Sequence, residues 1–433
     1  MSFLLEGKTI RKTREELLAE MPENLRAKIK VILMSPGLLR WLVDGIEEAG
    51  VAGERFLSLT IFLAGTSRLL SRPLAVIVQG PSASGKSYSI EQVAKLFPPE
   101  AILSATDITP NALYYMEPGE LEHKFVVAGE RPRRQNNETA ETTKSLREMI
   151  SNGELVKVVT ISDGDGPRAV TVRQKGPIAY VESTTAPELY EEDANRCLVL
   201  HSDERPEQTR RILLADAKQL KGESTGLRRD QVREGFQCLQ RMLIPLEVVI
   251  PFAQRLAELF PNEPLEVRRS FGHMTSMIKS IALLHHYQRP RDEAGRIVAQ
   301  PEDYFLARLL LDEVFGQSLG RKPAEALKRF VARVRTLTGE HTAKELAQSM
   351  NMSERTVREH LAELLELGLI TQSTPARGPI PAGWMIPADL SIREVRDSPL
   401  PTVLDVCGVD EEELQLPEMP ADWTSADLNE VPF

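Results

Sequence analysis

Residues 80–87 read Gly80-Pro81-Ser82-Ala83-Ser84-Gly85-Lys86-Ser87. This run matches the pattern G-x-x-x-x-G-K-[ST], in which a glycine-rich loop surrounds phosphate groups. The apolar run 74–78 before it predicts a buried parallel strand, and residues 89–96 after it follow a helical pattern. We therefore expect a strand, a loop and a helix whose backbone N–H groups bind a nucleoside triphosphate.

The chemistry of this loop predicts ATP and Mg²⁺ as cofactors. We expect all eight residues to contact the nucleotide. Lys86 would reach the β- and γ-phosphates, and the Ser87 hydroxyl would bind Mg²⁺. The alternative is a chance glycine loop between a strand and a helix, but the strand before it and the helix after it favour the phosphate site.

Apolar runs alternate with helical patterns between residues 73 and 215, which predicts an α/β fold with a parallel sheet and helices on both faces. The N-terminal helices would be a collar on this domain or a partner-binding domain, and the sequence leaves both open. The expected domains are a helical N-terminal region (1–72), the P-loop ATPase core (73–215), a helical lid (216–320), a winged helix-turn-helix (321–390) and an acidic disordered tail (391–433).

Composition predicts a cytoplasmic protein without a membrane segment. No apolar run reaches the ~18 residues needed to span a bilayer, and the N-terminus lacks a signal-peptide core. The three cysteines lie far apart and have no metal-type spacing. Nine acids and no Lys or Arg lie in residues 402–433, so the remaining body is nearly neutral despite the net charge of −10. Local basic patches and DNA binding are therefore compatible with this composition.

A second strand supplies the expected general base. The run 125–130 resembles the Walker B pattern of four apolar residues followed by Asp-Glu, with Gly129 at the Asp position and Glu130 at the Glu position. Glu130 would activate the attacking water. Either Ser87 and waters hold Mg²⁺ without the Asp, or Glu130 also contributes. The alternative is an ordinary acid at the end of a strand.

Two further segments resemble AAA+ ATPases. The run 180–185 looks like a sensor 1 strand, whose Thr184 or Thr185 would contact the γ-phosphate or the water; we place Thr184 in the site. Arg196 precedes the next strand, where helicases of the MCM group carry an arginine finger that acts on a neighbouring subunit. The resemblance therefore implies a homo-oligomer. The alternative is a surface arginine that caps Asp193 or Glu192.

More of the chain follows the same order. Residues 155–175 predict a β-hairpin with a turn at 163–166, at the place where MCM-type helicases carry a DNA-gripping pore hairpin. The helix that opens at residue 266 resembles the sensor 2 helix, with Arg268 as the best match and Arg269 as the adjacent alternative. The DNA-contacting cations of the hairpin would be Lys157, Arg168, Arg173 and Lys175.

These residues together resemble MCM-like AAA+ ATPases, of the kind carried by bacterial mobile elements and phages. The resemblance covers residues 73–390 and implies a hexameric ring that hydrolyses ATP on DNA.

Residues 342–372 have the spacing of a winged helix-turn-helix. Ser353 is placed to cap the second helix, and Gly368 to end it. Arg377 would lie in the wing. The alternative is a winged helix for protein contacts, since Glu residues share the recognition helix. The residues expected to face DNA are Arg355, Thr356, Arg358 and His360.

The acidic tail ends in Pro432-Phe433 and resembles the tip of bacterial single-stranded-DNA-binding proteins. That resemblance implies that Phe433 recruits replication proteins, whereas the alternative is a solubilising tail.

The function predicted from the whole chain is an ATP-dependent DNA helicase or translocase that replicates a mobile element. The alternatives are an AAA+ regulator whose ATP state controls DNA or protein binding without strand separation, and a structural ATPase in phage defence.

Overall fold

The computed structural model describes residues 12–109, 111–131, 137–163, 166–186, 189–222, 226–262, 267–318, 325–350, 352–366, 370–374, 382–387 and 398–414. The chain forms two compact units. The first comprises residues 1–260, 265–311 and 402–433, and the second comprises 261–264 and 312–401. The N-terminal helices therefore belong to the same unit as the P-loop, and the second unit is inserted between two parts of the first.

Five parallel strands form the central sheet of the first unit. Their order is β2-β3-β6-β1-β7, so β6 lies between the P-loop strand β1 and the strand β3 that carries Glu130. Because all neighbours are parallel, their carboxyl ends meet at one edge. The strands are β1 (Ala75–Gln79), β2 (Ile102–Ala105), β3 (Lys124–Arg131), β6 (Ile178–Thr184) and β7 (Leu198–His201).

Helices cover both faces of this sheet, which confirms the predicted fold class. α4 (Arg55–Thr66) is buried from Leu57 to Thr66 and packs with α5 (Lys86–Ala94) against β1, β3 and β6. On the other face α6 (Asn137–Asn152) contributes Leu146 and Met149 to a core with alternate residues of the strands. The alternation of apolar side chains along the strands therefore serves two separate cores.

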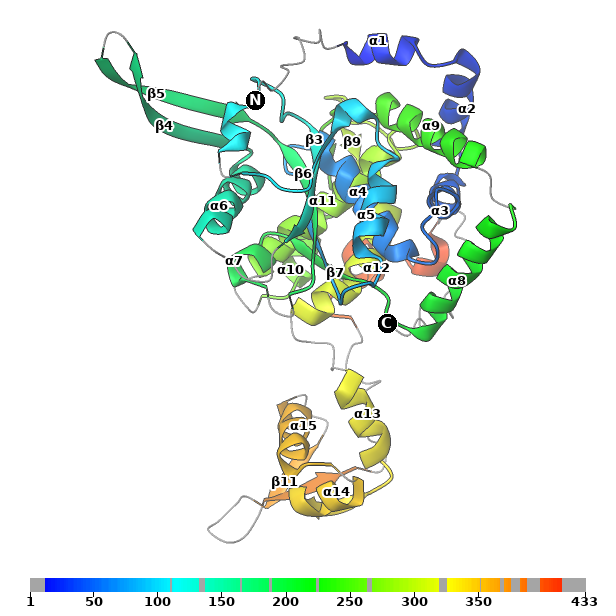
Figure 1. The fold of residues 1–433 in the computed structure, drawn as a ribbon. Coiled ribbons are helices and arrows are strands. Elements are labelled where there is room, and N and C mark those ends of the chain that lie inside the picture. Colours follow the sequence, from blue (N-terminus) through cyan, green and yellow to red (C-terminus); the bar gives the residue numbers. More distant parts are fainter. Residues whose placement is uncertain are drawn as a thin grey trace. The chain divides into compact units, whose positions relative to one another are not determined.

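The predicted hairpin is present and extends away from the sheet (Figure 1). It consists of β4 (Glu154–Asp163) and β5 (Gly166–Lys175), which pair from Glu154 opposite Lys175 to Asp163 opposite Gly166. Residues 164–165 of its turn lie outside the described residues. β5 ends only three positions before β6 begins, so the hairpin leads directly into the middle of the sheet.

The rest of the first unit is mostly helical. Within the described part of the chain, no helix is long and apolar enough to cross a membrane. The other elements are α1 (Arg14–Ala19), α2 (Glu23–Leu33), α3 (Leu38–Glu48), η1 (Ser67–Leu69), η2 (Pro99–Ala101), η3 (Ala112–Tyr115), α7 (Glu191–Ala194), α8 (Pro206–Leu220), α9 (Gly226–Met242), β8 (Val248–Val249), α10 (Ala253–Leu259), α11 (Val267–Leu284), β9 (Ile297–Val298), α12 (Pro301–Ser318) and η5 (Glu411–Glu413). The last turns of α12, from residue 312 on, belong to the second unit.

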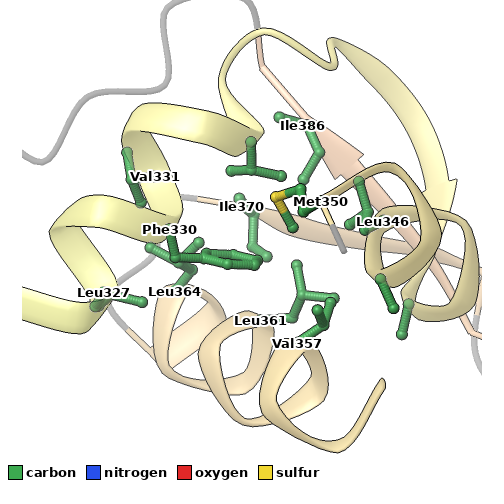
Figure 2. Packing of buried hydrophobic residues seen from close by; sticks show 13 residues of the cluster. Leu327, Phe330, Val331, Leu346, Met350, Val357, Leu361, Leu364, Ile370 and Ile386 are labelled. Atoms are coloured by element: carbon green, nitrogen blue, oxygen red, sulfur yellow. The ribbon is translucent and has the colours of Figure 1, made fainter. Parts of the chain in front are cut away.

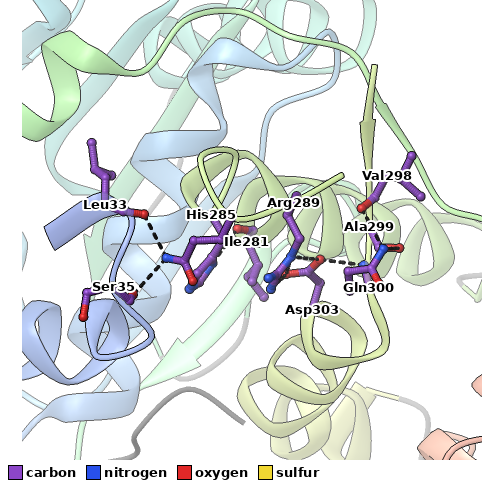
Figure 3. Close-up of polar contacts among 10 residues, drawn as sticks. Leu33, Ser35, Ile281, His285, Arg289, Val298, Ala299, Gln300 and Asp303 are labelled. Atoms are coloured by element: carbon purple, nitrogen blue, oxygen red, sulfur yellow. Dashed lines mark hydrogen bonds and ion pairs between the residues drawn. The ribbon is translucent and has the colours of Figure 1, made fainter. Parts of the chain in front are cut away.

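Polar side chains fix the turn between α11 and α12 (Figure 3). Asp303 is fully buried and forms an ion pair with Arg289, with its Oδ1 2.7 Å from the guanidinium. The same carboxylate accepts a 2.8 Å hydrogen bond from the Gln300 N–H at the start of α12. The Gln288 amide donates to the Leu33 carbonyl (2.8 Å) and the Ser35 carbonyl (3.0 Å), which ties this turn to the end of α2.

The second unit contains a helix-turn-helix with a small antiparallel sheet. Its helices are α13 (Glu325–Val334), α14 (Ala343–Met350) and α15 (Glu354–Glu366). Its strands β10 (Gly339–Thr342), β11 (Thr371–Thr374) and β12 (Gly383–Ile386) have the order β10-β12-β11. The three helices share a core in which Phe330, Leu346 and Leu361 are fully buried (Figure 2). Gly368 and Arg377 lie outside the described residues.

The prediction of a disordered tail from residue 391 is wrong for residues 398–414. α16 (Val403–Cys407) packs against α10, where Arg255 Nε donates to the Asp405 carbonyl over 3.1 Å. Val403 and Val406 are buried, and that apolar contact orders an otherwise acidic segment. Residues 415–433, with Phe433, lie outside the described part of the chain.

Candidate active site

The phosphate loop follows β1 and opens α5. Gly85 has φ 85° and Ala83 has φ 69°, so both lie in the left-handed region and curl the loop before the helix begins at Lys86. The first N–H groups of a helix have no partner within it, and they carry partial positive charge. This end of α5 is therefore built to receive an anion.

Contacts within the loop fix Lys86 and Ser84. Lys86 is buried, and its Nζ donates to the Pro81 carbonyl (2.5 Å) and the Ser84 hydroxyl (3.3 Å). Ser202, at the end of β7, donates to the Ser84 Oγ over 2.9 Å. A Cβ at Gly80 would lie 2.4 Å from the Ser202 hydroxyl, so a side chain there would displace this contact. The neighbouring strand therefore holds the loop.

The end of β6 carries three hydroxyl groups with different contacts. The Ser183 Oγ lies 3.2 Å from the Ser87 Oγ. Thr184 is fully buried, and its hydroxyl accepts a 3.1 Å hydrogen bond from the Ala186 N–H. The Thr185 hydroxyl donates to the Glu130 Oε1 over 2.8 Å. The structure thus brings Ser183 and Thr185, rather than Thr184, to the loop serine and the expected base.

Sequence reasoning missed Ser183, although a usable signal was present. Side chains alternate along an extended segment, so Ser183 and Thr185, the residue after β6, are expected on one side while Thr184 points to the other. From this alternation alone, the sequence could have predicted that the Thr184 hydroxyl points away from the side shared by the other two hydroxyls.

The backbone around Gly129 explains why the usual Asp is missing. A Cβ at this position would lie 2.2 Å from the Thr106 carbonyl oxygen and 2.9 Å from its carbon. These are backbone atoms that cannot rotate aside. The register of β3 against β6 also shifts between Val127 and Glu130. The loop after β2 therefore occupies the space that an Asp side chain would need, and Glu130 is left exposed at the strand end.

A buried cluster of four charges lies beside Glu130. Arg131 pairs with Glu182 and with Asp193, and the Arg147 Nε donates to the Asp193 Oδ1 over 2.5 Å. Glu182 and Asp193 are almost fully buried. Burial raises the pKa of Glu182, while the adjacent Arg131 opposes that rise. Through this cluster Arg131, which follows Glu130 in β3, is connected to α6 and to α7. α7 lies just before Arg196 in the chain.

Arg196 and Arg268 lie on different elements. The Arg196 Nε donates to the Ser151 hydroxyl over 2.9 Å, and its carbonyl lies 3.2 Å from the His273 Nε2. Burial lowers the pKa of His273 to about 4, so the ring is neutral at pH 7 and can donate to that carbonyl. Arg268 and Arg269 are exposed in the first turn of α11. The side chain of Glu192 lies outside the described residues.

The hairpin cations occupy two faces. The register places Arg173 opposite Val156 and Lys175 opposite Glu154 on one face, where Arg173 pairs with Glu154 over 3.1 Å. Lys157 and Arg168 belong to the other face. The Lys157 Nζ donates to the Asn111 Oδ1 over 2.6 Å. The four residues therefore do not form one continuous basic surface.

The recognition helix α15 presents two of its four predicted contact residues well. Arg355 and Arg358 are exposed, but each pairs within the helix, Arg355 with Glu359 (2.9 Å) and Arg358 with Glu354 (2.6 Å). As predicted, Ser353 caps the helix, since its Oγ accepts from the Thr356 N–H over 3.1 Å.

His360, the fourth predicted contact residue, is half-buried and lies against the core of the second unit. Its ring centroid lies 5.0 Å from that of the buried Phe330. His360 adjoins the apolar stripe of Val357, Leu361 and Leu364 around the helix, which turns its ring toward the core.

Two protein-family models match parts of this chain. The model of the MTBMA_p00010 P-loop domain matches residues 23–242. The chain belongs to this family. The MTBMA_p00010 P-loop domain here runs from the start of α2 to the end of α9, so it includes N-terminal helices as well as the sheet. A helix-turn-helix domain model matches residues 327–380. A search of the curated proteins finds no match.

The residues of this MTBMA_p00010 P-loop domain fit a magnesium nucleotide. Mg²⁺ usually takes one or two protein oxygens and completes its shell with phosphates and water. The Ser87 hydroxyl lies in the first turn of α5, 3.2 Å from the Ser183 hydroxyl, and is an oxygen of the kind that Mg²⁺ accepts. A P-loop domain joined to a helix-turn-helix domain is the combination of a DNA-associated ATPase.

Proposed function

We propose that this protein is an ATP-driven DNA helicase or translocase of the MCM-like AAA+ type, which serves replication of a mobile element. The observation that carries the proposal is the continuity of the hairpin with the sensor strand. β5 ends at Lys175, β6 begins at Ile178, and the far end of β6 carries Ser183, with Thr185 directly after the last strand residue. A shift of these hydroxyls on ATP hydrolysis would therefore be transmitted along one strand to the hairpin.

Each residue of the site has a role in this proposal. The loop N–H groups and Lys86 bind the phosphates, and Ser87 binds Mg²⁺. Glu130 takes the proton of the attacking water, and Thr185 orients the carboxylate through its 2.8 Å hydrogen bond. We assign this polar role to Thr185 in place of Thr184, because the Thr184 hydroxyl is buried and engaged by its own loop.

Two arginines complete the site across subunits. Arg196 of one copy stabilises the transferring phosphoryl group in the neighbouring copy, and Arg268 contacts the nucleotide as the sensor 2 residue. Such sharing requires a closed homo-oligomer, which the MCM-like resemblance makes a hexamer. DNA lies against the hairpin cations, while the winged helix and the tail contact DNA and replication proteins.

A second candidate is a regulatory ATPase that binds DNA without moving it. Two observations favour it. Gly129 replaces the usual metal-holding Asp, and the cations of α15 are paired within their own helix. Such a helix has less positive charge available for phosphates, which suits a switch that releases DNA.

A translocation assay separates the two candidates. A helicase or translocase, the motor candidate, removes streptavidin from a biotinylated single strand of DNA when it hydrolyses ATP. The Lys86→Ala variant is expected to lose both ATP hydrolysis and streptavidin removal. A regulator hydrolyses ATP and changes its DNA affinity, but leaves streptavidin in place. Hydrolysis by the wild type without removal from either end of the strand would refute the motor.

A further inference from the structure

A cavity of about 660 Å³ lies at the base of the hairpin, between η3, α6 and β4. Its volume lies in the range of sites that bind small organic ligands. No residue of the phosphate loop lines it, so it is separate from the ATP site. Its polar lining comes from Asn111, Tyr114, Lys144, Ser145, Glu148, Asn152, Glu154 and Lys157.

Lys144 and Lys157 line this cavity without a carboxylate partner among the described residues, so each can contact an anionic group. Both contacts of Lys157 among the described residues are with neutral groups: the Asn111 amide oxygen at 2.6 Å and the Tyr114 ring, whose centroid lies 5.2 Å from the ammonium. Two carboxylates also line the cavity. Glu154 pairs with Arg173, and the Asn152 amide donates to Glu148 over 2.6 Å, which holds that carboxylate on the surface of α6. Lys157 and Lys144 therefore retain charge for a ligand.

Tyr114 supplies a flat apolar surface beside these cations. Its ring is partly buried against the core that α6 shares with the sheet, so its orientation is fixed before a ligand binds. A fixed aromatic ring stacks on a nucleobase without regard to sequence. The amide groups of Asn111 and Asn152 can donate to or accept from the edge of that base.

We infer that this cavity binds one unpaired nucleotide of single-stranded DNA. The base stacks on Tyr114 in the place of the Lys157 ammonium, and Lys157 and Lys144 then contact the flanking phosphates. The inference rests on the proposed function because it gives the hairpin a base-gripping pocket beside its exposed strands. Base stacking also makes binding depend on the bases of the DNA strand, whereas contacts to the DNA phosphates alone would not.

The test compares binding of oligothymidine with binding of an abasic strand of equal length, by fluorescence anisotropy with ATP bound. Tyr114→Ala weakens binding of oligothymidine by about tenfold or more, whereas Tyr114→Trp retains it. Neither substitution changes binding of the abasic strand. Lys144→Ala weakens both ligands equally. Tyr115→Ala is the matched control, since Tyr115 is 75% exposed in the same short helix and does not line the cavity.

Several results would overturn the inference. These are equal affinity of the wild type for the two strands, failure to bind either, or a Tyr114→Ala variant that binds oligothymidine like the wild type. If Tyr114→Ala changed the sedimentation of the protein but not its binding of oligothymidine, the cavity would instead contact a second copy of the chain. Failure of the proposed function gives a different result from failure of this inference. In that case single-stranded DNA would still bind through Tyr114, but streptavidin would not be removed.

Discussion

Single residues at the sheet edge decide how the nucleotide site is built. Ser183 on β6 contacts Ser87, and Thr185, the first residue after β6, contacts Glu130. The Thr106 backbone leaves no room for a side chain at position 129. An Asp, which the Walker B pattern has at this position, therefore cannot be accommodated at residue 129.

Gly129→Ala is expected to destabilise the protein by about 2 kcal/mol or more, because the new methyl group would overlap the Thr106 carbonyl. Chemical denaturation measures the free energy of unfolding. The control is Gly272→Ala in α11, where nothing lies within 4 Å of the added Cβ, so stability stays equal or rises by up to about 1 kcal/mol. Similar losses in both variants would contradict this account of Gly129.

Glu54 should make stability depend on pH near neutrality. Burial, with a smaller contribution from the Asp203 charge, raises its pKa from 4.5 to about 7. Below pH 4.5 the carboxyl is protonated in both states, so it adds no penalty. Between 4.5 and 7 the unfolded state loses its proton first, so stability falls as pH rises, by at most about 3 kcal/mol.

Glu54→Gln tests this linkage while keeping an oxygen for the Asp203 N–H, which Glu54 accepts over 3.0 Å. The stability difference between variant and wild type should grow from pH 4.5 to 7 and then level off. Thermal unfolding across that range measures it. The exposed Glu258→Gln variant serves as control, and a difference that is constant with pH would exclude a raised pKa at Glu54.

At the scale of elements, the buried charge cluster joins β3, β6, α6 and α7. Asp193 receives Arg131 and Arg147, which arrive from β3 and α6. Because Arg131 follows Glu130 and Asp193 precedes Arg196, the cluster fixes the spacing between the expected base and the expected finger.

Asp193→Asn is expected to lower stability by about 3 kcal/mol or more, because the partly buried Arg147 loses the carboxylate it pairs with and Arg131 loses one of its two. Urea denaturation gives the value. Glu359→Gln removes the partner of the exposed Arg355 and should cost under about 1 kcal/mol. An Asp193→Asn variant as stable as Glu359→Gln would mean that the cluster contributes no net stability.

The elements differed in how well sequence could predict them. The P-loop, the parallel strands, the hairpin and the winged helix follow from local patterns of apolar residues, glycines and caps, and all are present. α16 could not be predicted, because its order depends on Val403 and Val406 meeting α10, about 150 positions away. The charge cluster and the Gly129–Thr106 contact likewise depend on long-range packing.

At the scale of the whole molecule, the proposed motor needs more than one copy. Arg196 acts in a neighbour's site, so Arg196→Ala and Lys86→Ala should each lack ATP hydrolysis, while a mixture of the two recovers part of it. Recovery follows because some interfaces join an intact Lys86 to an intact Arg196. Steady-state phosphate release measures this. A mixture no more active than its components would place Arg196 outside the shared site.

Strand separation tests the central claim most directly. A forked duplex with one labelled strand is incubated with ATP and the wild type, Lys86→Ala or Arg196→Ala. The wild type is expected to release the labelled strand over time, and neither variant is expected to release it. ATP hydrolysis by the wild type with the duplex left intact, on forks of either polarity, would contradict it.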